Sequence, residues 1–362
     1  MSITKEQVLH ALSHVDEPDL NKDLVTLNMI EDVRIEGKEV AFSVVLSSQE
    51  SPSKDMIYNA CVGAIHHFID KDIDVNVHMT ARVSSKNDNR KNTLPAVKNV
   101  VAISSGKGGV GKSTTTVNLA FALAREGARV GIIDADIYGP SIPTMVGLAD
   151  QRPGVDEVNG KQYIVPLEKH GIKVMSIGFM VREDQPVVWR GPMVSKALNQ
   201  FFSDVYWGEL DYLLIDLPPG TGDIQLSLAT SAPITATVVV TTPQEVALID
   251  VKKAISMFQL EQIQIPILGI IENMSWFTPE ELPNNKYFIF GENGGKNLAE
   301  KLDLPLLGEI PLVQGIREGG DYGSPIVLED GHPAAEAYKS MANKFLEQVL
   351  ILNSKEIHAA EL

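Results

Sequence analysis

A glycine-rich segment that directly follows an apolar run constrains the fold of this chain more than any other feature. The apolar run covers residues 100–104, and the segment at 106–113 reads Gly-Lys-Gly-Gly-Val-Gly-Lys-Ser. The spacing Gly-x4-Gly-Lys-Ser is typical of a loop that binds phosphate, and a helical stretch at 114–126 follows it. A buried strand, such a loop and a helix in this order predict an α/β fold with the loop at the start of the helix.

Each residue type in this loop has a physical reason to be there. Glycines allow backbone angles that are forbidden to other residues, so several N–H groups can point at phosphate oxygens. Lys112 can reach the β- and γ-phosphates of a nucleotide, and the Ser113 hydroxyl can bind Mg²⁺. The predicted nucleotide-binding residues of the loop are Gly106, Lys107, Gly108, Gly109, Val110, Gly111, Lys112, Ser113 and Thr114. A glycine-rich turn with a chance lysine is the alternative, and the strand and helix beside the loop argue against it.

Strands and helices alternate through the chain from residue 97 onward. Further apolar runs, of the kind buried on both faces of a parallel sheet, lie at 129–133, 212–215, 236–241, 266–271 and 305–307. Helical stretches separate these runs, which predicts an α/β domain over 97–350 with a doubly wound, mostly parallel sheet. The final helical stretch, 332–350, carries an apolar stripe that is typical of packing against a core.

A smaller domain precedes this one. Its predicted elements are a helix at 4–14, strands at 24–35 and 38–46, a helix at 52–70 and a strand at 74–80. Together they predict a small α+β domain over 1–83. The polar segment 84–96 is predicted to be a linker, and 351–362 a terminal tail.

Composition limits the location and the partners of the protein. The chain of 362 residues has no apolar run long enough to span a bilayer, and its first residues lack the apolar core of a signal peptide. We therefore expect a cytoplasmic protein. Its formal net charge of −16 repels nucleic-acid phosphates and anionic lipids, so we expect neither nucleic acid nor a membrane as a partner. The single cysteine, Cys61, excludes a disulfide within the chain.

Carboxylates at the ends of two predicted strands are candidates for a Mg²⁺ site. Asp216 follows the run 212–215, at the end of the strand where ligands of open α/β sheets bind. Asp134 and Asp136 follow the run 129–133. An aspartate after a strand can also cap a helix, and for Asp134 this alternative stays open. The predicted metal-binding residues are Ser113, Asp134 and Asp216.

One further lysine in the loop points to a family. Lys107 directly follows the first glycine, and the resulting Lys-Gly-Gly-x-Gly-Lys-Ser resembles the deviant Walker A loop of the ParA, MinD and nitrogenase iron-protein family. The resemblance implies an ATP-dependent homodimer in which Lys107 contacts the nucleotide of the partner subunit. It also implies that Asp136 positions the attacking water and that Asp134 contacts a Mg²⁺-bound water. Catalytic roles are thus expected for Lys107, Lys112 and Asp136.

Two residues resemble the adenine site of that family. Asn273 follows the run 266–271 and resembles the asparagine that recognises the base, since a side-chain amide pairs with both a donor and an acceptor. Pro311 matches the segment that covers the base. A capping asparagine and a turn proline are the alternatives. The segment 220–223, Gly-Thr-Gly-Asp, resembles the loop that senses the γ-phosphate.

Other segments resemble the Mrp/ApbC branch, whose members are ATPases that carry iron–sulfur clusters to apo-proteins. The matching segments are Val-Trp-Arg-Gly-Pro-Met at 188–193 and Ile-Glu-Asn-Met-Ser at 271–275, and residues 19–34 resemble a MIP18-like domain associated with iron–sulfur assembly. The resemblance implies a homodimeric, Mg²⁺-dependent ATPase. Its partners would be iron–sulfur assembly proteins and apo-protein targets, with the N-terminal domain as the adaptor.

The chain departs from that branch at the cluster ligands. The branch typically has Cys-x-x-Cys after Asn-Met-Ser, whereas this chain reads Trp-Phe-Thr-Pro-Glu-Glu-Leu-Pro at 276–283. Ser51-Pro52 stands where the N-terminal domain usually has a cysteine before proline. Cys61 lies on an apolar helical stretch and is expected to be a buried small hydrophobe. An iron–sulfur cluster would therefore need ligands beyond those that the resemblance supplies.

Two alternative functions stay open. A positioning ATPase like ParA or MinD would bind DNA or membrane, which the acidic charge and the core-like stripe of 332–350 argue against. A cluster-independent scaffold would use the ATP-dependent dimer only to recruit partners, and the sequence does not separate it from a cluster carrier.

Overall fold

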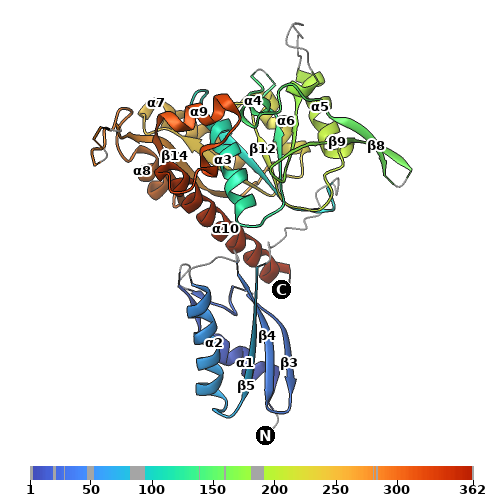
Figure 1. Ribbon diagram of the computed structural model, residues 1–362, viewed down its shortest axis with the longest axis vertical. Helices are drawn as coiled ribbons and strands as arrows, with labels where there is room; N and C mark the ends of the chain where they lie inside the picture. The colour runs from blue at the N-terminus through green and yellow to red at the C-terminus, as the bar shows by residue number, and fades with distance from the viewer. Residues whose placement is uncertain are drawn as a thin grey trace. The chain divides into compact units, whose positions relative to one another are not determined.

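The computed structural model divides the chain into two compact units (Figure 1). It describes residues 3–18, 22–27, 29–46, 53–81, 94–137, 139–158, 160–180, 191–279, 281–282 and 284–360. The first unit comprises Met1–Ser84 and Leu346–Leu362, and the second comprises Ser85–Phe345. Most of the predicted linker, 84–96, lies outside the described residues.

An eight-stranded sheet forms the centre of the larger unit, with the order β10-β11-β7-β12-β6-β13-β14-β15. Its strands are β6 (Val97–Ser105), β7 (Val130–Asp134), β10 (Leu167–Lys169), β11 (Ile172–Ser176), β12 (Leu210–Asp216), β13 (Ala236–Thr241), β14 (Ile267–Phe277) and β15 (Leu306–Leu312). Neighbouring strands are parallel except for the antiparallel edge pair β10 and β11. Every residue of β12 is buried, as expected for a strand covered on both faces. The prediction of a mostly parallel α/β sheet is confirmed.

Helices cover both faces of this sheet (Figure 1). They are α3 (Lys112–Arg125), α4 (Ile142–Met145), α5 (Gly191–Ser203), α6 (Asp223–Ser231), α7 (Glu245–Phe258), α8 (Gly294–Lys301), α9 (Gln314–Tyr322) and α10 (Pro333–Ala360). Leu213 of β12 packs in a core cluster with Phe201 of α5 and Leu228 of α6. Tyr212, on the opposite face of the same strand, has its ring 5.5 Å from that of Phe345 on α10. The sheet is therefore doubly wound.

Four strands of the larger unit were not predicted from the sequence. They are β8 (Gly154–Val158) and β9 (Lys161–Val165), which form a hairpin, and the edge strands β10 and β11. The two hairpin strands pair antiparallel and are almost wholly exposed or half-buried. Because neither strand is buried on both faces, neither shows an apolar run of the kind that revealed the inner strands.

Helix α10 extends beyond the end that the sequence analysis expected. Its apolar stripe is buried, at Ala335, Tyr338, Met341, Ala342, Phe345, Leu346 and Val349, which confirms core packing. The helix continues through the predicted tail to Ala360, and its residues from Leu346 onward cluster with the N-terminal unit. Leu350 packs against the hydrophobic core of that unit. Among the described residues, none of the helices is both long and apolar enough to cross a membrane.

The N-terminal unit is a small α+β structure. It contains α1 (Lys5–Leu12), α2 (Lys54–Phe68), the two-residue strands β1 (Asp16–Glu17) and β2 (Lys22–Asp23), and a sheet of β3 (Ile30–Glu36), β4 (Glu39–Leu46) and β5 (Asp74–Ala81). The strand predicted at 24–35 is wrong in its first part, because residues 24–27 form a turn. Asp23 Oδ1 accepts a hydrogen bond from the Thr26 backbone N–H at 2.7 Å, which stabilises the turn. The side chains of Leu24 and Leu27 in this turn are buried. Their apolar character resembled the pattern of a strand in the sequence.

Candidate functional site

The glycine-rich loop connects β6 to α3, as predicted. Gly109 and Gly111 have φ angles of 83° and 80°, which glycine adopts without a steric penalty. A Cβ atom at Gly106 would lie 2.3 Å from the backbone carbon of Asp250 on α7, so only glycine fits there. The loop backbone is thereby held at the N-terminus of α3, where N–H groups are free to face an anion.

Asp216 gathers three side chains of α3 at the end of β12. Lys112 Nζ lies 2.7 Å from Asp216 Oδ2, and the Ser113 hydroxyl donates to the same oxygen at 2.6 Å. The Thr116 hydroxyl donates to Asp216 Oδ1 at 2.7 Å. Both Lys112 and Asp216 are almost fully buried, which strengthens their attraction relative to a surface pair. Thr116 was not predicted as a site residue, although it lies one helical turn after Lys112 and shares its face of α3.

Asp134 lies beside Asp216, because β7 and β12 are paired in register at these two residues. Burial and the nearby charge of Asp216 raise the pKa of Asp134 to about 8. The Ser176 hydroxyl donates to Asp134 Oδ2 at 2.9 Å, and the Asp136 backbone N–H donates to Oδ1 at 3.2 Å. Asp136 is half-buried at the end of β7. Ser176, at the end of the unpredicted strand β11, is a member of this network that the sequence analysis missed.

These groups suit a magnesium nucleotide. Mg²⁺ prefers oxygen ligands, and the hydroxyl of Ser113 and the carboxyl oxygens of Asp216 and Asp134 supply them next to the phosphate loop. The Lys112 ammonium can exchange its carboxylate partner for phosphate oxygens when a nucleotide arrives.

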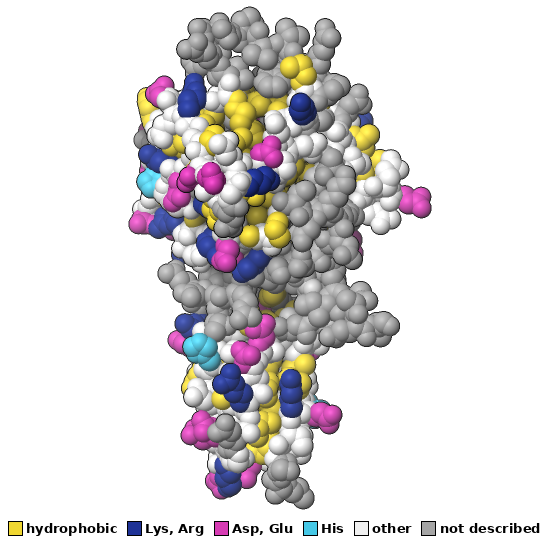
Figure 2. All heavy atoms as spheres, turned by 90° about the vertical axis from the view of Figure 1, so that its right-hand side faces the viewer, with side chains coloured by type: hydrophobic (Ala, Val, Ile, Leu, Met, Phe, Trp, Pro, Cys, Tyr) yellow, Lys and Arg dark blue, Asp and Glu magenta, His cyan; other side chains and the backbone are white. Residues whose placement is uncertain are grey.

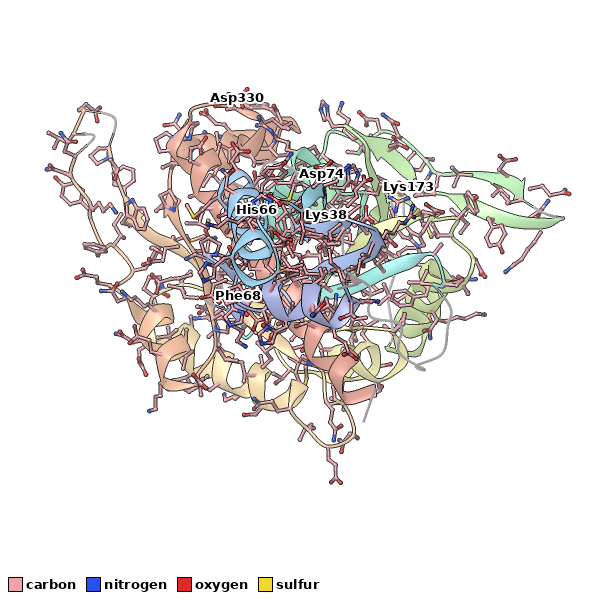
Figure 3. The ribbon with its side chains drawn as sticks, turned by 90° about the horizontal axis from the view of Figure 1, so that it is seen from below. Lys38, His66, Phe68, Asp74, Lys173 and Asp330 are labelled. Atoms are coloured by element: carbon pink, nitrogen blue, oxygen red, sulfur yellow. The ribbon has the colours of Figure 1, made fainter. Side chains whose placement is uncertain are left out.

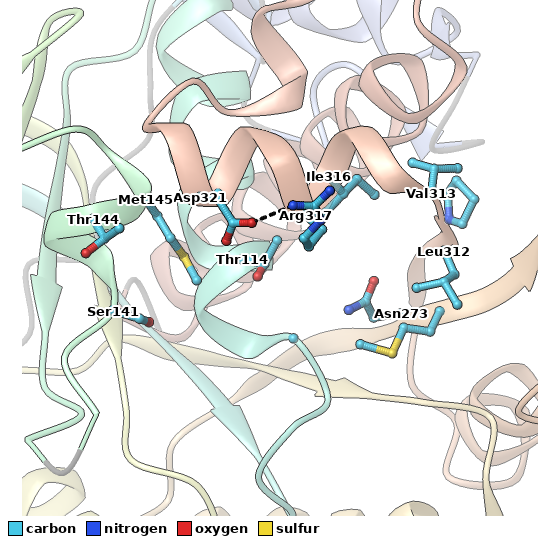
Figure 4. A pocket seen from close by; sticks show the side chains of 14 residues that line it. Thr114, Ser141, Thr144, Met145, Asn273, Leu312, Val313, Ile316, Arg317 and Asp321 are labelled. Atoms are coloured by element: carbon cyan, nitrogen blue, oxygen red, sulfur yellow. Dashed lines mark hydrogen bonds and ion pairs between the residues drawn. The ribbon is translucent and has the colours of Figure 1, made fainter.

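A cavity of about 480 Å³ opens beside the loop, and Figure 4 shows its lining. Gly111 and Thr114 line one side, and the predicted adenine-site residues Asn273 and Pro311 line another. The Asn273 amide donates to the Val110 carbonyl oxygen at 2.8 Å, which ties the end of β14 to the phosphate loop. The volume lies within the range of small-molecule sites.

Helices α4 and α9 complete the cavity, and the sequence analysis predicted neither as part of the site. They contribute Ser141, Thr144 and Met145 near α4, and Ile316, Arg317, Gly320 and Asp321 on α9. For α9, the sequence signal is the adjacent pair of an apolar and a charged residue, Ile316 and Arg317, a few residues after Pro311.

Comparisons with known proteins bear directly on this geometry. Residues 96–346 match the family model described as NUBPL iron-transfer P-loop NTPase. The chain belongs to the NUBPL iron-transfer P-loop NTPase family. Residues 5–79 match a second family model, described as iron–sulfur cluster assembly protein.

Relatives of known name cover nearly the whole chain. A protein of Synechocystis named iron–sulfur cluster carrier protein is 46% identical over 96% of this chain and 98% of its own length. A protein of Escherichia coli K12 with the same name is 42% identical over 95% of this chain and 92% of its own. A solved structure of a nucleotide-binding protein from Archaeoglobus fulgidus, in complex with ADP, is 38% identical. It covers 70% of this chain and 96% of its own, with a TM-score of 0.59.

Lys107, the other lysine of the phosphate loop in this P-loop NTPase, has different surroundings from Lys112. The side chain of Lys107 is exposed, and its carbonyl oxygen accepts a hydrogen bond from the Ser105 hydroxyl at 3.0 Å. The loop after β12 is tied to the same region, since the Gly220 N–H donates to the Ser105 carbonyl oxygen at 2.9 Å. The side-chain amide of Gln225, on α6, donates to the carbonyl oxygen of Pro218 in the loop before this helix.

The side chains that could bind iron are dispersed in the described part of this NTPase. No group of three or more His, Cys, Asp or Glu side chains there could hold a metal ion. Cys61 is fully buried in the N-terminal core, and burial raises the pKa of its thiol to about 12, which disfavours a thiolate. His66 Nε2 lies 3.0 Å from the Ile73 carbonyl oxygen. The ring of Phe68, which Figure 3 labels together with His66, is exposed. It stacks on the ring of His14 with the ring centroids 4.3 Å apart. Ser51-Pro52, Glu280 and Pro283 lie outside the described residues, as do 188–190.

Proposed function

We propose that this protein is a homodimeric, Mg²⁺-dependent ATPase that acts in the carriage or assembly of iron–sulfur clusters. The observation that carries the proposal is the convergence of Lys112, Ser113 and Asp216 at the start of α3, beside a nucleoside-sized cavity. The iron–sulfur role is supported by relatives that share at least 42% identity over nearly the whole chain and are named cluster carriers.

Each residue of the site has a role in this proposal. Ser113 and Asp216 hold Mg²⁺, which neutralises phosphate charge when bound, and Asp134 contacts a water of its shell. Lys112 binds the β- and γ-phosphates, and Asp136 positions the attacking water. Lys107 reaches the nucleotide of the partner subunit, a role for which its exposed side chain is suited.

The cluster is cargo in this proposal, and this chain supplies few ligands for it. A dimer contains two thiols in all, one Cys61 from each subunit, and both are buried. A cluster normally takes four protein ligands, so the others must come from a target protein, a partner or a small thiol. ATP binding and hydrolysis would switch the dimer between two shapes and so control this partner.

The nucleotide part is tested by a pair of lysine variants. Lys112 and Lys98 each form an ion pair with a buried aspartate of β12, Lys112 with Asp216 and Lys98 with Asp211 at 2.8 Å. We expect Lys112→Ala to abolish Mg²⁺-dependent ATP hydrolysis and Lys98→Ala to retain it, because only Lys112 faces phosphate. Steady-state phosphate release measures both. Wild-type turnover in Lys112→Ala would refute the P-loop assignment.

The cluster part needs a transfer assay. An apo-protein that accepts a [4Fe–4S] cluster is mixed anaerobically with iron, sulfide, a small thiol and Mg-ATP, and recovery of its activity is followed. We expect wild-type protein to accelerate recovery, and the Lys112→Ala variant to leave it at the uncatalysed rate. Equal rates with and without the wild-type protein, for targets and assembly partners from the same cell, would refute carriage while leaving the ATPase intact.

A further inference from the structure

A carboxylate faces the cavity that the proposed function assigns to the nucleoside. Asp321 of α9 lines this cavity together with Thr114 of α3 and Asn273 of β14. Figure 4 shows Asp321 and its neighbour Arg317 pointing from α9 toward Thr114. Among the described residues that line the cavity, Asp321 is the only one with a negative charge.

A carboxylate at this position would repel the ligand, because a nucleoside triphosphate brings several negative charges to the adjacent loop. Arg317 offsets that cost. Its Nη1 donates to Asp321 Oδ2 at 2.8 Å, and its Nη2 donates to Glu318 Oε1 at 2.9 Å. The guanidinium is thus held by two carboxylates on the same helix, and it orients Asp321 through one of its oxygens. The other oxygen, Oδ1, is an acceptor whose charge is already balanced.

The connectivity of a nucleotide decides which part of it meets this acceptor. Phosphates lie at the P-loop, beside Gly111, and the base lies at Asn273 and Pro311 in the proposed function. Ribose links the two, so it lies in the same cavity, which Thr114 and Asp321 also line. Ribose hydroxyls can donate, and an ionised carboxylate can only accept. The same pairing of an acidic residue with a ribose hydroxyl recurs in dinucleotide-binding folds.

We infer that Asp321 selects ribonucleotides over deoxyribonucleotides by accepting a hydrogen bond from a ribose hydroxyl, and that Arg317 positions it. The inference rests on the proposed function, in which this site binds ATP. It makes α9 the element that recognises the sugar, whereas the loop recognises phosphate and β14 recognises the base.

The test is a binding cycle with the full chain and Mg²⁺. Wild type, Asp321→Ala and Glu318→Gln are each titrated calorimetrically with ATP, 2′-deoxy-ATP and 3′-deoxy-ATP. Wild type should bind at least one deoxynucleotide about tenfold more weakly than ATP, because a hydrogen bond to a charged group is lost. Asp321→Ala should bind ATP about tenfold more weakly than wild type does and should no longer distinguish that deoxynucleotide from ATP.

Glu318→Gln is the matched control. Glu318 contacts the same arginine on the same helix but does not line the cavity, so this variant should keep the discrimination. Equal affinity of wild type for all three nucleotides overturns the inference, and so does discrimination that survives in Asp321→Ala. Both results leave ATP binding intact. Failure of wild type to bind ATP at all overturns the proposed function itself, and this inference with it.

Discussion

Two aspartates on β12 have lysine partners but different surroundings. Asp216, at the carboxyl end of the strand, meets Lys112 and two hydroxyl groups of α3. Asp211, near the other end, meets Lys98 at 2.8 Å and the guanidinium of Arg129 at 3.1 Å. Permanent cations therefore saturate Asp211, whereas Asp216 keeps neutral oxygen neighbours that a metal ion can share. The ion pairs of Asp211 therefore stabilise the fold, whereas Asp216 is suited to binding a metal ion.

The charge state of Asp211 yields a prediction about stability and pH. Burial opposes its ionisation, but hydrogen bonds from Arg129 and Lys98 outweigh that effect and lower the pKa of Asp211 to about 2, from an ordinary 3.8. Because the native pKa is the lower one, ionised Asp211 stabilises the fold above about pH 4, and this stabilisation is lost as pH falls toward about 2. We expect Asp211→Asn to lower the urea midpoint at neutral pH. The difference in urea midpoint between this variant and wild type should shrink as the pH falls from about 4 to about 2.

The matched control for this prediction is Glu209→Gln. Glu209 pairs with the same arginine, but its side chain is 76% exposed, so its loss should change the urea midpoint little. Midpoints followed by circular dichroism across the acid range measure both variants. A gap between Asp211→Asn and wild type that stays constant with pH would contradict the linkage to Asp211.

At the scale of elements, α3 has a left-handed glycine just beyond each end. Gly111 precedes it with φ of 80°, and Gly127 follows it with φ of 87°. A side chain at either position costs about 1–2 kcal/mol in backbone strain. A Cβ at Gly111 would also lie 2.2 Å from Asn273 Nδ2, whereas a Cβ at Gly127 would have no atom within 4 Å.

The two glycines therefore separate strain from function. We expect Gly127→Ala to lose about 1–2 kcal/mol of stability with unchanged ATP affinity. Gly111→Ala should lose ATP binding as well, because its methyl group displaces Asn273 from the loop. Calorimetric titration with Mg-ATP and urea unfolding distinguish the two effects. Wild-type ATP affinity in Gly111→Ala would show that the Asn273 contact is unimportant.

Most of the strands that were predicted in the larger unit are those buried on both faces. Strands β6, β7, β12 and β13 are covered on both faces and read as apolar runs, and the P-loop has a local spacing that needs no tertiary information. The hairpin of β8 and β9 is exposed and leaves no such pattern. Helix α9 contains Gly315, Gly319 and Gly320, which weaken its helical signal, so its part in the cavity emerged only from the fold.

At the scale of the whole molecule, the two units differ in the reactive groups that they contain. The P-loop lies in the larger unit, and the only thiol of the chain, Cys61, lies in the smaller one. On the face drawn in Figure 2, Lys and Arg side chains lie among Asp and Glu side chains. A net charge of −16 makes the chain as a whole repel polyanions.

The burial of this thiol leads to a prediction about cargo. We expect the anaerobically purified protein to hold little or no iron and sulfide, with or without ATP, because its buried thiol cannot ligate a cluster without unfolding the core around it. For the same reason Cys61→Ser should leave the ATPase rate unchanged. Iron and sulfide quantification and phosphate release are the measurements. A stoichiometric, chelator-resistant cluster that disappears in Cys61→Ser would identify this thiol as the ligand.

The last prediction concerns the dimer. The side chain of Lys107 is exposed, and its proposed partner is the phosphate of the other subunit. Lys107→Ala should therefore bind ATP nearly normally yet hydrolyse it ~10³-fold more slowly, as expected for the loss of a cation that stabilises the transition state in trans.

Mixing Lys107→Ala with Lys112→Ala subunits tests the geometry. In the mixed dimer the intact P-loop of the Lys107→Ala subunit faces a partner that still supplies Lys107, so hydrolysis should recover in part. Each variant incubated alone is the control and should stay inactive. If size-exclusion chromatography shows mixed dimers and the rate does not rise, Lys107 does not act across the interface.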